Sequence, residues 1–278
     1  MLELVTGAVV DQSEGLRHWM PTSAAPGVRV VAMVSRGEPR TEQPLLWQVC
    51  TTLQSLGHRV AVLDGTTAES AGNPGLQDLL DHAHWLDAPD RTETDWQIVP
   101  ARSGLAGLAR LADESLAHGD EGDRPLAPLG PLFRNFQTVL LYTRADILGS
   151  LLSGTEVRPL LAMAPSKSSI VNGYQTLKQL LQKTCRMPIV ASLVTAPQKA
   201  AEQRATVAAR SLRHCAATYL GLEADVMNVR SFPQQDKPSE DTPRLVQQLL
   251  DSAASLGDTW CAPSHHREFS AVHLARSQ

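Results

Sequence analysis

The sequence predicts a doubly wound α/β fold, in which helices flank a mostly parallel sheet. Two observations carry this prediction. Short runs such as VRVVAMV at 28–34 and PIVASLV at 188–194 are apolar at successive positions, as strands are when helices cover both faces of their sheet. These runs alternate with longer segments whose apolar residues recur every three or four positions, which is the spacing of a buried helical face.

The first strand–helix–strand unit starts at residue 28. After the strand at 28–34 we expect a loop at 35–44 and then a helix, because apolar side chains recur at helical spacing through Leu45, Leu46, Val49, Leu53 and Leu56. Gly57 is expected to end this helix, since glycine readily adopts the left-handed backbone found there. The second strand is RVAVL at 59–63.

The alternation continues almost to the end of the chain. Further strands are expected at 137–142, 158–163, 188–194 and 225–229. Further helices are expected at 104–117, 171–183, 198–220 and 245–253. Two segments rich in proline and charge, 118–131 and 233–243, are typical of exposed loops.

Three parts follow from this pattern. Residues 1–27 hold a short helix and a linker, residues 28–256 form one α/β domain, and residues 257–278 form a tail. The chain length of 278 residues is compatible with a single large domain.

Charge and cysteine content exclude several classes of function. The chain has 25 Lys and Arg against 29 Asp and Glu, so its net charge of -4 offers no overall positive field to nucleic acid. The four cysteines lack the short paired spacing of a zinc site, and no apolar run is long enough for a spanning helix. His82 and His84, beside Asp81 and Asp87, alternate as solvent-facing side chains do. We expect a cytoplasmic protein with no metal and no direct nucleic-acid contact.

One segment resembles a known family. Residues 163–181, MAPSKSSIVNGYQTLKQLL, are similar to the TTPEPTSITDAYALIKLL segment of the MinD/ParA family, a group of P-loop ATPases. Taken from the residues alone, this segment has Pro165 at the end of a strand and Ser168 or Ser169 as helix cap. Its buried helical face is expected to hold Val171, Tyr174, Leu177 and Leu181. The resemblance implies a MinD-like fold with ATP and magnesium as cofactors.

The residues with which that family binds ATP are replaced. Counting back without a gap from LGHRV, which resembles the family's LGKRV, places its KGGxGKT loop on GEPRTEQ at 37–43. Gly37 and Glu42 replace the two phosphate-binding lysines, and Gln43 replaces the hydroxyl that binds magnesium. Pro39 removes a backbone N–H donor. Because Glu42 brings a negative charge towards the phosphates, the sequence predicts loss of ordinary ATP binding.

The other nucleotide-contact positions of the family are altered too. Asp64 keeps only the first carboxylate of the family's DAD pair. Tyr142 and Asp146 fall on the acid and the glycine of the DTxAG segment, and Ser192 falls on the asparagine that reads adenine. Loss at so many positions together predicts a pseudo-ATPase.

A second resemblance lies at the N-terminus. DQSEGLR, from Asp11 to Arg17, is similar to the DQAxxLR signature of the FlhG (FleN) family, MinD-like regulators of flagellar number. The resemblance implies a helix that docks on FlhF, a GTPase of the signal-recognition-particle type, and stimulates its GTP hydrolysis through Asp11 and Gln12. By their chemistry, Asp11 can cap a helix, Leu16 offers an apolar contact and Arg17 can pair with an acid. A helix packed on its own domain is the alternative.

The leading hypothesis is therefore an FlhG-like pseudo-ATPase that regulates flagellar number or placement. We expect a monomer, because the family's dimer depends on ATP, with weak or no membrane contact and recruitment to the cell pole. A transcription regulator of the FleQ type is a further candidate partner. Two alternatives stay open: a divergent ATPase that holds nucleotide with Arg36 or Arg40, and a MinD-like scaffold in another surface assembly such as cellulose secretion.

Overall fold

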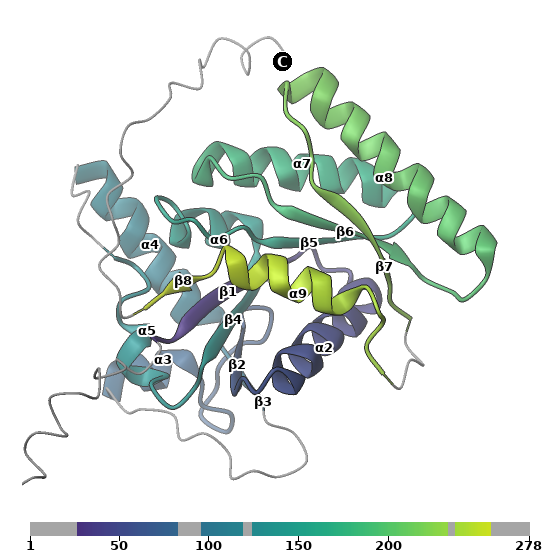
Figure 1. Ribbon diagram of the computed structural model, residues 1–278. Helices are drawn as coiled ribbons and strands as arrows, with labels where there is room; N and C mark the ends of the chain where they lie inside the picture. Colours follow the sequence, from purple (N-terminus) through teal and green to yellow (C-terminus); the bar gives the residue numbers. More distant parts are fainter. Residues whose placement is uncertain (1–26, 83–95, 119–123, 233–236, 257–278) are drawn as a thin grey trace, which may run out of the picture.

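The computed structural model describes residues 27–82, 96–118, 124–232 and 237–256. Within these ranges the centre of the molecule is a sheet whose strands run parallel in the order β3-β2-β4-β1-β5-β6-β7, with β8 paired antiparallel to the start of β1 (Figure 1). The strands are β1 (Arg29–Ser35), β2 (Val60–Asp64), β3 (Trp96–Pro100), β4 (Thr138–Arg144), β5 (Leu160–Met163), β6 (Ile189–Val194), β7 (Val226–Arg230) and β8 (Ala254–Ser255). The predicted fold class is confirmed.

Helices cover both faces of this sheet. They are α2 (Pro39–Ser55), α3 (Leu76–His82), α4 (Arg102–His118), α5 (Leu129–Leu132), α6 (Ala145–Leu151), α7 (Lys167–Thr184), α8 (Lys199–Leu220) and α9 (Thr242–Asp251). Helices α2 and α9 pack against each other on one face. On the other face α3, α4, α6, α7 and α8 form a row in which each helix contacts the next.

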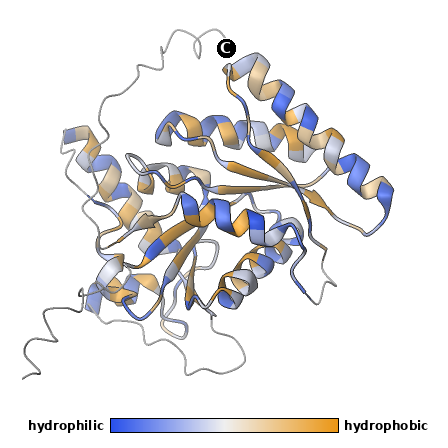
Figure 2. Ribbon diagram, viewed as in Figure 1, coloured by the Kyte–Doolittle hydropathy of each residue, from blue (hydrophilic) through white to orange (hydrophobic). Residues whose placement is uncertain are grey.

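The strands are apolar at successive positions because each face of the sheet has its own core. In β1, Val30, Ala32 and Val34 pack towards the row that starts at α3, whereas Val31 and Met33 pack towards α2 and α9. Figure 2 shows hydrophobic residues along the central strands and mixed colouring on the helices around them. This two-sided burial is the physical origin of the pattern from which the fold was predicted.

The elements that the sequence did not reveal are short or lie at an edge. Helices α3 and α6 have 7 residues each and α5 has 4, too few turns for a clear period. Strand β3 is an edge strand with Ile98 53% exposed. The two segments predicted as exposed loops are partly buried: Leu126 and Leu129 of the first pack into the core, and Ser239 and Thr242 of the second are buried. The second of them ends earlier than predicted, at the start of α9.

The connections define where a ligand would bind in such a fold. Strand β1 continues through α2 towards β2 on one side, whereas its neighbour β5 continues through α7 towards β6 on the other. Adjacent strands whose connections diverge leave a crevice at their carboxyl ends, and α/β proteins bind ligands there. In this molecule that crevice lies beside Arg36 and Met163.

Candidate nucleotide site

The turn after β1 is shorter than predicted. Helix α2 begins at Pro39, so the expected loop at 35–44 is wrong over its second half, which is helical. Proline suits the first position of a helix, because its φ is already helical and the N–H it lacks would have no partner inside the helix. Gly37 has a φ of 75°, a left-handed conformation that lets the chain turn sharply into α2. Gln43, the expected replacement for the magnesium ligand, is exposed.

The side chain of Glu42 fills the head of α2. It is 0% exposed, and its carboxylate accepts three hydrogen bonds. The Arg36 N–H donates to Oε1 over 2.8 Å, and the hydroxyls of Ser35 and Tyr142 donate to Oε2 over 3.2 and 2.7 Å. A backbone N–H and two hydroxyls at a helix N-terminus form a donor set for an anion. Here the anion belongs to the helix itself.

Tyr142 holds this arrangement from β4. Its side chain is buried, and its hydroxyl donates to the Glu42 carboxylate near the carboxyl ends of the paired strands β1 and β4. Burial raises the pKa of Tyr142 well above its ordinary value, as does the negative charge of Glu42, and the contact with Ser35 opposes this only in part. The phenol therefore stays protonated and remains a donor to the carboxylate.

Arg36 fills the crevice between β1 and β5. Its side chain is 5% exposed, and Nη2 donates to the Ala162 carbonyl over 2.8 Å and to the Ser169 hydroxyl over 2.9 Å. Nη1 donates to the Ser169 carbonyl over 3.1 Å, and Glu38 lies 3.2 Å from Nη2. The two terminal nitrogens of the guanidinium are thus occupied by the chain's own acceptors, whereas Nε is buried without a hydrogen-bond partner among the described residues. Arg40 is exposed on α2.

The Ser169 hydroxyl is available to bind Arg36 because it does not cap α7. Ser166 is the N-cap, and its hydroxyl accepts a hydrogen bond from the Ser169 N–H. The prediction of Ser168 or Ser169 as cap was therefore wrong. The predicted buried face was also displaced: Val171 is 55% exposed, while Leu177 is buried as predicted. The residues that α7 buries are Ser169, Gly173, Leu177, Leu180 and Thr184.

The acidic residues at the ends of β2 and β4 also find hydrogen-bond partners within the chain. Asp64, at the end of β2, accepts hydrogen bonds from the N–H and hydroxyl of Thr66 over 2.8 and 2.6 Å and from the Thr67 hydroxyl over 2.7 Å. Asp146 pairs with Arg144 at the start of α6, over 2.5 and 3.1 Å. Burial favours a higher pKa for Asp146, but the hydrogen bonds and charge of Arg144 outweigh it and lower the pKa.

Glu69 is a part of this edge that the sequence did not single out. Its carboxylate accepts hydrogen bonds from the N–H groups of Ser103 and Gly104 over 2.8 and 3.0 Å, at the first turn of α4. Burial favours a higher pKa for Glu69, but these backbone donors outweigh it and lower the pKa. Its partners lie more than thirty positions away in the chain, so no local motif could identify it. Helices α2, α4 and α6 thus each begin beside a carboxylate of the chain itself.

Ser192, at the position predicted for adenine recognition, serves a different contact. It is buried on β6, and its hydroxyl donates to the Ala205 carbonyl of α8 over 2.8 Å. This bond ties the strand to the helix above it.

These residues do not fit ATP with magnesium. A phosphate at the head of α2 would compete with Glu42 for the same donors and would meet its negative charge. Among the described residues, no three His, Cys, Asp or Glu side chains come together in one group. His82 instead lies against Asp78, and His84 falls outside the described residues.

The proposed partner-binding segment, with Asp11, Gln12, Leu16 and Arg17, also lies outside the described residues. Within those residues, every helix is too short or too polar to cross a membrane.

Comparisons with known proteins give structural likeness only. No family model matches the sequence, and no curated protein matches it. Similar solved structures include a chain of the MinC:MinD cell division protein complex of Aquifex aeolicus, with a TM-score of 0.47, 14% identity and coverage of 81% of this chain and 94% of that one. A plasmid partition protein of Borrelia burgdorferi has a TM-score of 0.48, 10% identity and coverage of 81% and 97%. The cell division ATPase MinD of Pyrococcus furiosus has a TM-score of 0.42, 18% identity and coverage of 81% and 97%. These three likenesses show nothing of ligand or activity.

Proposed function

We propose that this protein is an FlhG-like regulator of flagellar number or placement that acts without a nucleotide cycle. The observation that carries the proposal is the buried carboxylate of Glu42, which already uses the N–H of Arg36 and the hydroxyls of Ser35 and Tyr142. The occupied guanidinium of Arg36 supports the same reading, because it disfavours the alternative in which Arg36 binds nucleotide.

A regulator of this kind acts through binding. DQSEGLR supplies the surface: an acid and an amide at Asp11 and Gln12, followed by Leu16 and Arg17 one turn later. A short segment of this kind is only marginally helical alone and gains order when a partner covers its apolar side. The partner that the resemblance favours is an FlhF-like GTPase, with the protein recruited to the cell pole by that contact.

GTP turnover by FlhF tests this proposal. We expect the full chain to raise the rate of GTP hydrolysis without added ATP, and we expect the double variant Asp11→Ala, Gln12→Ala to lose the stimulation. The matched control is Glu3→Ala, which removes an acid upstream of the motif and should leave stimulation intact. If the wild-type chain leaves FlhF turnover unchanged, the FlhF proposal fails and a scaffold in another assembly becomes the better hypothesis.

A further inference from the structure

Three hydrogen-bond donors converge on the Glu42 carboxylate from two neighbouring strands. The Ser35 hydroxyl and the Arg36 N–H lie at the end of β1, and the Tyr142 hydroxyl comes from β4. Met33 of β1 is opposite Tyr142 in the register of these strands, and both side chains pack on the α2 face of the sheet. Because side chains alternate between the two faces of a strand, Ser35 lies on the same face as Met33. The sheet therefore directs both hydroxyls towards α2.

The donors are also held by contacts other than those with Glu42. The Ser35 oxygen accepts a hydrogen bond from the Gly37 N–H over 3.4 Å, which leaves the hydroxyl proton to point at the carboxylate. The Arg36 residue is anchored between β5 and α7 through its guanidinium, so its backbone N–H keeps its position. Ser35 and Tyr142 are each 5% exposed. Donors that are buried and fixed by the surrounding structure are preorganised for an anion.

The arrangement of these donors matches the two oxygens of a carboxylate. Oε1 of Glu42 takes the Arg36 N–H over 2.8 Å, and Oε2 takes the hydroxyls of Tyr142 and Ser35 over 2.7 and 3.2 Å. Each oxygen thus has a donor, although Glu42 is 0% exposed. A phosphate would bring two further oxygens into this buried place, and these three donors would leave them unpaired, which is costly. The geometry therefore favours a planar carboxylate over a tetrahedral anion.

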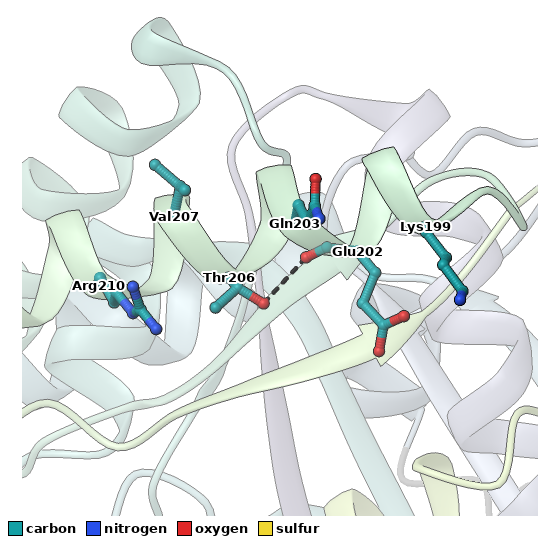
Figure 3. Close-up of a pocket in the computed structure, with 6 residues that line it drawn as sticks. All are labelled: Lys199, Glu202, Gln203, Thr206, Val207 and Arg210. Atoms are coloured by element: carbon teal, nitrogen blue, oxygen red, sulfur yellow. Dashed lines mark hydrogen bonds between the residues drawn. The ribbon is translucent and has the colours of Figure 1, made fainter.

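A depression of about 580 Å³ on α8 is the contrasting case. The described residues that line it all belong to this one helix, and none of them is buried. Val207 points to the other side of α8 from Thr206 and Arg210 (Figure 3), and the Thr206 hydroxyl donates to the Glu202 carbonyl of the same helix over 2.9 Å. Side chains of this kind converge on no ligand, whereas the donors around Glu42 do.

We propose that Ser35, Arg36 and Tyr142 form a carboxylate-binding site, and that Glu42 is a tethered ligand which occupies this site permanently. A ligand carried by the chain binds intramolecularly, so no diffusible molecule of low concentration displaces it. The head of α2 then keeps its position without any free ligand. This inference deepens the proposed function and rests on it in one respect: a regulator without a nucleotide cycle needs a helix head that nucleotide does not control.

Urea denaturation of the full-length Glu42→Ala variant in sodium formate tests this proposal. The variant keeps all three donors and lacks the tethered carboxylate, which formate can replace as a free ion. Formate is exchanged for chloride at neutral pH and constant ionic strength. Because a ligand of the folded state raises stability with the logarithm of its concentration, we expect the urea midpoint of the variant to rise towards the wild-type value. The wild type and the control Glu38→Ala, in which Glu42 still occupies the site, should show only the general effect of the salt.

Two further arms test the donors and the choice of anion. Adding Tyr142→Phe to Glu42→Ala removes one donor and should weaken the response to formate. Phosphate at the same ionic strength should stabilise Glu42→Ala no more than it stabilises the wild type.

If Glu42→Ala does not fold in chloride, the same series is followed as recovery of the helical circular dichroism signal on refolding from urea. The proposal is overturned by an equal response of Glu42→Ala and the wild type to formate, by no recovery in formate, or by a larger response to phosphate than to formate. Neither FlhF nor ATP is present in this series. Its failure therefore leaves the FlhF proposal standing, and a failure of FlhF stimulation leaves the carboxylate site standing.

Discussion

At the scale of single residues, the site consists of polar groups that form hydrogen bonds with one another. The sequence indicated that Glu42 places an anion where phosphate would lie, and the structure adds what the sequence could not: its partners. Ser35 and Arg36 precede it by a few positions, but Tyr142 is a hundred positions away and meets it only through the pairing of β1 with β4. Contacts of this kind depend on strand order, which a local motif does not encode.

Removing the Glu42 carboxylate should destabilise the fold. Glu42→Ala leaves two hydroxyls and the Arg36 N–H without their acceptor in a buried place, and each unsatisfied buried group costs about 1–3 kcal/mol. We expect a loss of roughly 3 kcal/mol in the free energy of unfolding, measured by urea denaturation. Glu42→Gln, which keeps one acceptor oxygen and the volume, should lose less.

The control for Glu42 is Glu38→Ala, which changes a half-buried glutamate at the preceding turn that forms an ion pair with Arg36. Its loss should cost about 1 kcal/mol or less, as for most ion pairs near the surface. Equal stability of the Glu42→Ala variant and the wild type would show that the carboxylate does not hold the head of α2.

At the scale of elements, what the sequence predicted depended on length and burial. Strands β1, β4 and β6 were evident, because burial on both faces makes most of their successive positions apolar. Helix α2 was predicted to start too late, because its first turn carries no apolar stripe. The turn is instead stabilised by Pro39 at its first position and by the inward reach of Glu42. Such capping is a polar signal that apolar periodicity cannot reveal.

The start of α7 gives a test at this scale. Ser166→Ala removes the hydroxyl that accepts from the Ser169 N–H, and loss of a serine cap costs about 1 kcal/mol. Thermal unfolding should show this loss. Ser168→Ala is the matched control: its exposed hydroxyl lies 3.2 Å from that of Ser166, so the stability of this variant should change by less than about 0.5 kcal/mol. A larger loss of stability for Ser168→Ala than for Ser166→Ala would instead identify Ser168 as the cap, one of the two residues that the sequence predicted.

The start of α4 gives a test by pH. The folded state lowers the pKa of Glu69, so the ionised carboxylate stabilises the protein above its unfolded-state pKa, and this contribution is lost as pH falls through the folded value. Glu69→Gln keeps an acceptor for the Ser103 N–H but has no charge to lose. We expect the wild type to be more stable than this variant at about pH 6 and the difference to shrink at about pH 3.

Urea midpoints at both pH values measure this difference. Asp81→Asn, which removes an exposed carboxylate from α3, serves as the control for the loss of one negative charge. A difference between the wild type and Glu69→Gln that grows as the pH falls would contradict the assignment.

At the scale of the whole molecule, fold and function separate. The sequence predicted the doubly wound sheet correctly, because the alternation of strands and helices is a property of the entire chain. The chain's own Arg36 fills the crevice between β1 and β5, and Glu42 fills the head of α2 beside it.

The most direct test of this account is binding of ATP with magnesium, followed as the thermal unfolding of the full chain. A ligand at 100 times its dissociation constant adds about 2.7 kcal/mol to stability, so even weak binding should be visible at millimolar nucleotide. We predict no shift of the unfolding temperature, with a MinD protein that carries an intact phosphate loop as the positive control. A saturable rise that disappears in an Arg36→Ala variant would contradict the account and would favour a divergent ATPase.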